Sequence, residues 1–212
     1  MGKGGRGAVL EPREKWQGEH AAERYTTARF RSRAAAERDP RTVARLLARH
    51  GVRRADSVLD VPSGTGRLRP ALEGLGLWVT GADISPAMLA RDPSERSLLA
   101  AAECLPFRKG SFDAVVCCRL LHHLTSDDAL ERTIAELARV SRGLVLASFW
   151  DRNSWPGWRR SMGLRPDSSG RRPIPKRVLA RCFARAGAPI IETTHSLRFL
   201  SMQAFAVARV RP

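Results

Sequence analysis

The sequence lacks any long hydrophobic run. Its apolar stretches all fall short of the roughly 18 residues that a membrane-spanning helix needs. The glycine-rich, charged N-terminus also lacks the apolar core of a secretory signal peptide. We therefore expect a cytoplasmic protein with no membrane span.

Cysteine is scarce as well. The four cysteines are Cys104, Cys117, Cys118 and Cys182, and they form no C-x-x-C pair. Such spacing predicts neither a metal site nor a disulfide, so buried, reduced thiols are the expectation.

Acidic residues are few in comparison with basic ones. The chain has 21 Asp and Glu against 37 Lys and Arg, which gives a formal net charge of +16. A basic surface attracts nucleic acid, anionic lipid or acidic small molecules. Because the arginines are scattered through every segment, the pattern favours a generally basic surface, with nucleic acid as an alternative partner.

The pattern from residue 57 onward is that of an α/β fold. Short apolar runs alternate with helical stretches, which is typical of a parallel sheet with helices on both faces. Two final apolar runs suit an antiparallel C-terminal hairpin, so we expect a seven-stranded, mostly parallel sheet. The expected strands are 57–61, 77–83, 97–102, 112–118, 143–149, 189–195 and 200–210. The expected helices are 39–50, 66–75, a short one after Ser85, 126–140 and 176–186.

We expect a disordered tail over residues 1–15 and a single domain over 16–212. Residues 16–50 suit a helical lid, and Asp39-Pro40 suggests an N-cap followed by a proline in the first turn. The segment 150–175 is rich in Pro, Gly, Trp and Arg. Long irregular segments inside compact domains are usually functional, which points to a substrate loop.

The strongest motif is VLDVPSGTGRL (58–68), in which a predicted strand ends at Asp60 and a turn carries Gly64 and Gly66. Glycine allows the tight turn and lets a ligand lie against the main chain. Arg69 stands where a dinucleotide fingerprint would have its third glycine, which argues against a nicotinamide dinucleotide.

Asp83, at the end of the second predicted strand, is the second candidate for a binding residue. A carboxylate at that place can accept hydrogen bonds from both hydroxyls of a ribose. The alternative is a surface capping role. Its position 17 residues after Gly66 favours the ribose.

Five motifs together carry a family resemblance: VLDVPSGTGRL, GADISPAML, AAECLPFRKGSFDAVVC, LLHHL and ELARVSRGLVLASF. Their order and spacing over residues 55–150 resemble those of class I methyltransferases that use S-adenosylmethionine (SAM). They resemble the branch that includes the methyltransferases of ubiquinone and menaquinone biosynthesis. The resemblance implies methyl transfer from SAM to a small or lipid-like acceptor.

The resemblance also implies which residues bind the cofactor. The turn would border the methionine part of SAM, Asp83 would hold the ribose, and the remaining positions would lie near the adenine or the methionyl group. The implied cofactor residues are Asp60, Pro62, Ser63, Gly64, Gly66, Asp83, Ile84, Met88, Ala102, Glu103, Cys118 and Arg119. Relatives often carry Asp where Ala101 stands, so its contact with the adenine amino group is missing here or is made by Glu103.

A general base is needed only if the acceptor arrives protonated. His122 and His123 follow the fourth predicted strand, and either can accept a proton near neutral pH. The alternative is that the tripeptide HHL (122–124) only shapes the start of a helix. Of the two, His123 is the better candidate for a catalytic base.

Candidate substrate residues are Tyr25, Trp155 and Trp158. Tyr25 is the sole tyrosine and lies in the expected lid, while the tryptophans alternate with arginines in the expected loop. Aromatic and guanidinium groups suit an acceptor pocket or nucleic acid. Alternative functions are therefore RNA or protein methylation, or a non-catalytic nucleic-acid-binding module of the same fold. An NAD-dependent oxidoreductase is disfavoured by the missing glycine.

Overall fold

The computed structural model describes residues 33–155, 158–159, 162, 171–196 and 201–211. Its centre is a seven-stranded sheet with the strand order β3-β2-β1-β4-β5-β7-β6. The strands are β1 (Ser57–Asp60), β2 (Trp78–Asp83), β3 (Ser97–Leu99), β4 (Phe112–Cys117), β5 (Ser141–Trp150), β6 (Ile190–His195) and β7 (Gln203–Arg209). The first five are parallel, and β7 runs antiparallel to both β5 and β6. The predicted sheet and its C-terminal hairpin are confirmed.

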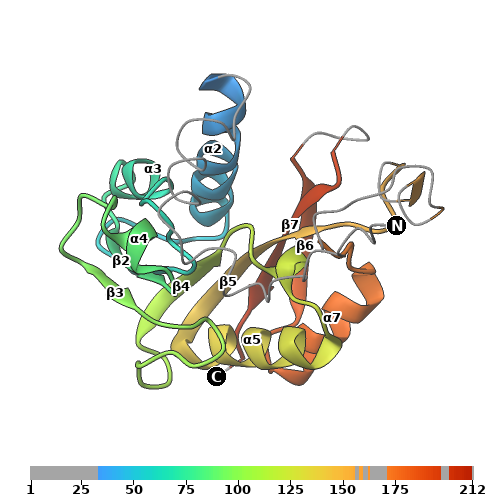
Figure 1. Ribbon diagram of the computed structural model, residues 1–212. Helices are drawn as coiled ribbons and strands as arrows, with labels where there is room; N and C mark the ends of the chain where they lie inside the picture. Colours follow the sequence, from blue (N-terminus) through green and yellow to red (C-terminus); the bar gives the residue numbers. More distant parts are fainter. Residues whose placement is uncertain (1–32, 156–157, 160–161, 163–170, 197–200, 212) are drawn as a thin grey trace, which may run out of the picture.

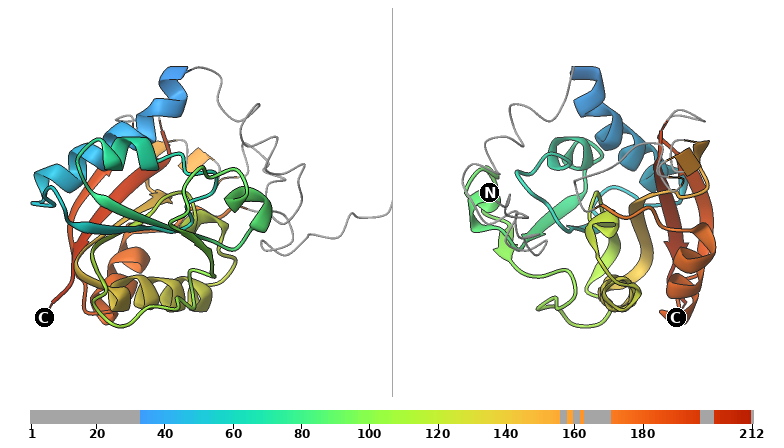
Figure 2. Two further views of the ribbon diagram at one scale, coloured as in Figure 1. Left: turned by 90° about the vertical axis from the view of Figure 1, so that its left-hand side faces the viewer. Right: turned by 45° about the vertical axis from the view of Figure 1, so that its right-hand side comes forward.

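Helices cover both faces of the sheet, as predicted (Figure 1). One face carries α2 (Arg33–Arg49) and α3 (Arg69–Glu73), and the other carries α5 (Asp127–Val140) and α7 (Lys176–Arg185). The short α4 (Pro86–Leu89) follows β2, and a 3-10 turn, η2 (Leu121–His123), follows β4. Figure 2 shows these layers from two further sides. No helix in the described ranges is both long and apolar enough to cross a membrane.

The core is split into two layers because successive side chains of a strand point to opposite faces. In β4, Ala114 and Val116 join the cluster under α2, whereas Val115 packs toward α5. Helix α2 contributes Val43, Leu46 and Leu47, the i, i+3, i+4 stripe of an amphipathic helix. This double packing fixes the carboxyl ends of β1, β2 and β4 at a common edge.

Helix α5 begins where the sequence predicts. The Ser126 hydroxyl accepts a hydrogen bond from the Ala129 amide at 3.1 Å, and Asp127 and Asp128 occupy the first turn. Such a cap contributes about 1 kcal/mol to helix stability.

The predicted N-cap at Asp39 is wrong. Helix α2 runs without a break from Arg33 through Pro40, and Asp39 is buried inside it. Proline has no N–H to donate, so the Ala36 carbonyl loses its helical partner. Arg67 replaces that partner, donating from Nη1 to the Ala36 oxygen at 2.9 Å. A side chain from the glycine turn thus allows the helix to continue through a proline.

Three other predictions either differ from the structure or concern residues outside the described ranges. Strand β3 ends at Leu99, so it is shorter than the predicted 97–102. Cys104 is exposed, while Cys117, Cys118 and Cys182 are buried, and all four are free thiols. The expected tail (1–15), the first part of the expected lid and the middle of the 150–175 segment lie outside the described residues.

Candidate cofactor and acceptor site

Strands β1 and β2 end side by side at the edge where the glycine turn begins. They pair in parallel, with Asp60 opposite Gly81, so Asp60 and Asp83 both lie at their carboxyl ends. Ligands of open parallel sheets bind at this edge. The sequence therefore brings its two candidate carboxylates to the predicted place.

The two turn glycines have different reasons to be glycine. Both have positive φ, +59° at Gly64 and +74° at Gly66. A Cβ on Gly66 would lie 2.5 Å from Oδ1 of Asp92, whereas a Cβ on Gly64 would meet no described atom within 4 Å. Gly66 is thus required by packing, and Gly64 presents bare main chain to open space, which is what a ligand cradle needs.

Asp83 faces this cradle. Its Oδ2 accepts a hydrogen bond from the Gly64 amide at 2.8 Å, and its Oδ1 accepts one from the Ser85 amide at 2.9 Å. Burial raises the pKa of Asp83, although the backbone hydrogen bonds from Ser85, Gly64 and Ile84 partly oppose that rise. Because each carboxylate oxygen has two lone pairs, these bonds leave acceptor capacity for ribose hydroxyls.

Asp60 is the least satisfied acid of the site. It is 1% exposed, and its Oδ1 has no hydrogen-bond partner among the described residues. Burial raises its pKa from 3.8 to about 8, against the opposing charges of Arg67 and Arg69. A cationic group held at the turn would therefore stabilise the ionised form of Asp60.

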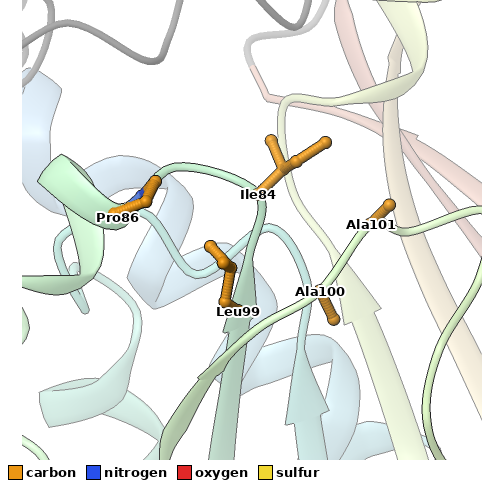
Figure 3. A pocket seen from close by; sticks show the side chains of 5 residues that line it. All are labelled: Ile84, Pro86, Leu99, Ala100 and Ala101. Atoms are coloured by element: carbon orange, nitrogen blue, oxygen red, sulfur yellow. The ribbon is translucent and has the colours of Figure 1, made fainter.

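A cavity of about 610 Å³ with apolar side chains in its wall lies at the ends of β2 and β3 and begins at Ile84, the residue after Asp83 (Figure 3). Ile84 and Pro86 line it from the end of β2, and Leu99, Ala100 and Ala101 line it from the end of β3. In Figure 3 the side chains of Ala100 and Ala101 point to opposite sides of their strand segment. Apolar walls at neighbouring strand ends suit a flat ring such as adenine.

The other predicted adenine residues lie behind or beyond this wall. Met88 is 3% exposed and Ala102 is 7% exposed, and Ala102 belongs to the hydrophobic core. Neither they nor Glu103 are among the lining residues of the cavity. Ala101, where relatives often carry Asp, does line it, so the departure from the family pattern falls in the cavity wall itself.

Arg69 explains why the third glycine is absent. Its guanidinium is buried and pairs with Asp92, with Nε 3.2 Å from Oδ1 and Nη2 3.1 Å from Oδ2. It also donates to the Val79 carbonyl and to Ser97. Burial alone would raise the pKa of Asp92, but hydrogen bonds from Arg69, Ser97 and Ser94 lower it overall. The turn is thus tied to β2 and β3 by a buried ion pair.

At the end of β4, Cys118 and Arg119 lie next to β5. Burial raises the pKa of Cys118 to about 12, so its thiol stays protonated. Arg119 has a φ of +66°, which is unusual for a residue with a side chain. Its amide donates to Ser148 Oγ at 2.7 Å, and its Nε donates to Asp39 Oδ2 at 2.7 Å.

Asp39 joins several elements of the edge at which the predicted site lies, a role that the sequence did not reveal. Its Oδ2 accepts from Arg119 and from Arg67 Nη2 at 3.2 Å, and its Oδ1 accepts from Gln203 Nε2 at 3.4 Å. One carboxylate therefore joins α2, the glycine turn, β4 and β7. These partners are up to 164 residues apart, and no local pattern signals such a contact.

The two histidines after β4 are buried. The His122 ring stacks on Trp150 with centroids 4.7 Å apart, and the His123 ring lies 4.5 Å from the His122 ring. Both belong to η2, so the tripeptide forms a 3-10 turn packed against β5 rather than the start of an α-helix.

The predicted substrate residues lie apart from the cavity or outside the description. Trp155 and Trp158 stack on each other at 5.3 Å and are 63% and 46% exposed. Tyr25 lies outside the described residues.

A second histidine site occupies the same edge and was missed. Asp151, directly after β5, is 1% exposed, and its Oδ2 lies 2.9 Å from His195 Nε2 and 3.2 Å from Lys176 Nζ. Since β6 is antiparallel to β7, and β7 to β5, the end of β6 at His195 returns to the carboxyl edge. Asp151 and His195 are 44 positions apart in the sequence, so no local pattern predicts this pair.

Comparison with known proteins agrees with this geometry. Residues 59–145 match the family described as a methyltransferase domain. An uncharacterized methyltransferase of Mycobacterium tuberculosis is 39% identical over 115 residues, which cover 51% of this chain and 46% of that protein. The demethylmenaquinone methyltransferase of Mycolicibacterium gilvum is 36% identical over 97 residues, covering 45% of this chain and 42% of the relative.

The fold has a close counterpart among solved structures. The magnesium protoporphyrin IX methyltransferase of Synechocystis PCC 6803, solved with bound S-adenosylhomocysteine (SAH), superposes with a TM-score of 0.73. Its sequence identity is 17%, and the alignment covers 94% of this chain and 98% of the other. At this identity the likeness concerns the fold. The chain spans less than half the length of the curated relatives described above, 46% of one and 42% of the other.

Proposed function

We propose that this protein transfers a methyl group from SAM to a small or lipid-like acceptor. The observation that carries the proposal is the open main chain at Gly64, whose amide binds Asp83, the residue before Ile84 in the cavity wall. The match of residues 59–145 to a methyltransferase domain supports it. The similarity to a demethylmenaquinone methyltransferase supports the acceptor class.

The residues present fit the cofactor part by part. Asp83 would accept hydrogen bonds from the ribose, and Ile84, Leu99 and Ala101 would enclose the adenine. The unsatisfied, buried Asp60 would favour the positive charges of the methionyl end. Pro62, Ser63 and Gly64 would form the floor of that end.

When bound, SAM supplies a methyl group that its sulfonium already makes electrophilic. The protein then has to orient the acceptor and exclude water, and such alignment can contribute about 7–11 kcal/mol. Arg119, fixed by Ser148 and Asp39, would form the wall between the cofactor and the acceptor.

His123 is the proposed base for an acceptor that arrives protonated. It is 8% exposed and lies on the turn that follows β4, four residues after Arg119. Replacing it with Gln should lower kcat by about 10²-fold or more and remove the acidic limb of the pH profile. His195→Gln serves as the comparison, because it removes a histidine that lies at the end of β6 instead of in η2.

Calorimetry tests the cofactor assignment. We expect SAM and SAH to bind and NAD to fail to bind. Asp83→Ala should weaken SAH binding by about 1–3 kcal/mol, because buried hydrogen bonds to ribose are lost. Asp113→Ala is the control, since Asp113 lies at the opposite end of β4 and binds Ser57 and Arg142. Absence of SAM and SAH binding, or equal binding by wild type and Asp83→Ala, would contradict the proposal.

A further inference from the structure

The segment Arg171–Ile174 is held against the acceptor side of the edge by its backbone. The Arg172 amide donates to the His122 carbonyl at 2.8 Å, and the Ile174 amide donates to the Trp150 carbonyl at 2.7 Å. Ile174 also forms a parallel bridge with Asp151. These contacts fix the position of Arg171, which precedes them in the chain.

Arg171 lies over an aromatic surface built by the two neighbouring strand ends. Its Cζ is 5.3 Å from the centroid of the Trp150 ring, and that ring is stacked on His122. A guanidinium lying on an indole is oriented by the ring. The stack therefore joins η2, which follows β4, to the end of β5.

The Arg171 guanidinium has no anionic partner in the described part of the chain. Its Nε is buried without a hydrogen bond, and no carboxylate of these residues forms an ion pair with it. Burial lowers the pKa of Arg171, and the positive charge of Arg119 lowers it further. A half-buried cation with no counter-charge is unfavourable unless a ligand supplies one.

The charged residue that acts on Arg171 is itself a cation, Arg119. By contrast, the neighbouring Arg172 pairs with an acid, Asp127, at 2.7 Å. Arg171 therefore differs from the residue beside it, because it is half-buried and has no acidic partner among the described residues.

We propose that Arg171 is a binding residue for a carboxylate carried by the acceptor. A planar guanidinium presents a fork of donors that matches a carboxylate, and Trp150 fixes the plane of that fork. The inference rests on the proposed function, because it places the acceptor on the β4–β5 side of the edge. It narrows the acceptor to an organic acid, bound at a distance from the adenine cavity.

Binding of organic acids and their matched amides tests the proposal. The probes are benzoate, indole-3-acetate and hexanoate, each paired with its neutral amide and followed by ligand-observed NMR with and without saturating SAH. We expect the wild type to prefer each acid over its amide. Arg171→Gln should weaken acid binding by about 10- to 100-fold without affecting the amides. Arg171→Lys should restore only part of the binding, because lysine lacks the fork.

Arg185→Gln is the matched control. It removes the same charge from an exposed pair with Glu131, so acid binding should not change. Equal binding of acids and amides by the wild type, or equal acid binding by Arg171→Gln and Arg185→Gln, would overturn the proposal.

Binding of SAH distinguishes a carboxylate of the acceptor from the methionyl carboxylate of the cofactor. If Arg171 instead bound the methionyl carboxylate of the cofactor, Arg171→Gln would weaken SAH but not 5′-methylthioadenosine, which lacks that group, and the acceptor assignment would be overturned. Failure of SAH to bind at all would contradict the proposed function. The acid preference measured without SAH would still decide the role of Arg171.

Discussion

The two halves of the carboxyl edge are built in different ways. On the β1–β3 half, Asp83 and Arg69 have hydrogen-bond partners that are near them in the sequence. Asp83 binds Gly64 and Ser85, and Arg69 binds Asp92. On the β4–β6 half, polar groups are satisfied by distant partners, such as Asp39 with Gln203. The first half is a compact backbone frame suited to one constant ligand. The second is assembled from side chains, which suits an acceptor that varies between proteins of this fold.

Breaking the Arg69–Asp92 pair of the β1–β3 half should have the largest effect on the free energy of unfolding. Arg69→Ala leaves the fully buried Asp92 carboxylate without its cation. We expect a loss of about 3–5 kcal/mol in the free energy of unfolding, measured by urea titration. Arg132→Ala, which breaks an exposed pair with Asp128, should cost less than about 1 kcal/mol. Similar losses in the two variants would mean that the buried pair does not hold the turn.

Breaking the contacts that Asp39 makes with distant residues should reduce the free energy of unfolding by a smaller amount. Asp39→Ala removes the carboxylate that Arg67 and Arg119 share, but these side chains are 16% and 23% exposed, so water partly compensates. We expect a loss of about 2–4 kcal/mol and faster amide hydrogen exchange in α2. Asp127→Ala, in the half-exposed pair with Arg172, is the control. Unchanged exchange in α2 would show that Asp39 does not anchor this helix.

Asp60 makes the stability of the first half depend on pH. Its pKa is raised from 3.8 to about 8 in the folded protein, so the folded state holds an extra proton between these values. Stability from this group is therefore lost as the pH rises through that window. Relative to wild type, Asp60→Asn should become more stable by about 1–3 kcal/mol as the pH rises from 4 to 8. A stability difference that does not change with pH would rule out an elevated pKa.

The same group should couple cofactor binding to proton release. SAM is cationic at its methionyl end and would favour ionised Asp60, so binding near pH 7 should release protons and tighten as the pH rises toward 8. Calorimetry in buffers of different ionisation enthalpy measures the release, and Asp60→Asn should abolish it.

The smallest effect is expected at the aromatic stack of the second half. His122→Leu removes the stacking on Trp150, which should reduce the free energy of unfolding by about 0.5–1.5 kcal/mol. The near-UV circular dichroism of the tryptophans should change as well. An unaltered spectrum would mean that His122 does not orient Trp150.

The sequence was sufficient to predict the β1–β3 half of the edge, where the patterns are local. The alternation of strands and helices, the glycine turn and the acid 17 residues later are short-range patterns, and the structure places Asp60, Gly64 and Asp83 together. It failed where distant contacts override local propensity. Asp39-Pro40 has the pattern of a helix start, but Arg67 from the turn satisfies the carbonyl that proline leaves unpaired.

Contacts of the second half could not be predicted for the same reason. Asp39, Asp151 and His195 matter through partners that only the folded sheet brings near, and neither spacing nor composition marks them. Arg171 was visible as one of many arginines. That it has no acidic partner among the described residues became apparent only from the structure.

A crystal structure with bound SAH tests the division of the edge most directly. The account predicts the adenine between Ile84 and Leu99, the ribose hydroxyls on Asp83, the thioether beyond Gly64 and no contact between SAH and Arg171. An adenosine group bound at Trp150 and Arg171, with the cavity at Ile84 empty, would contradict it.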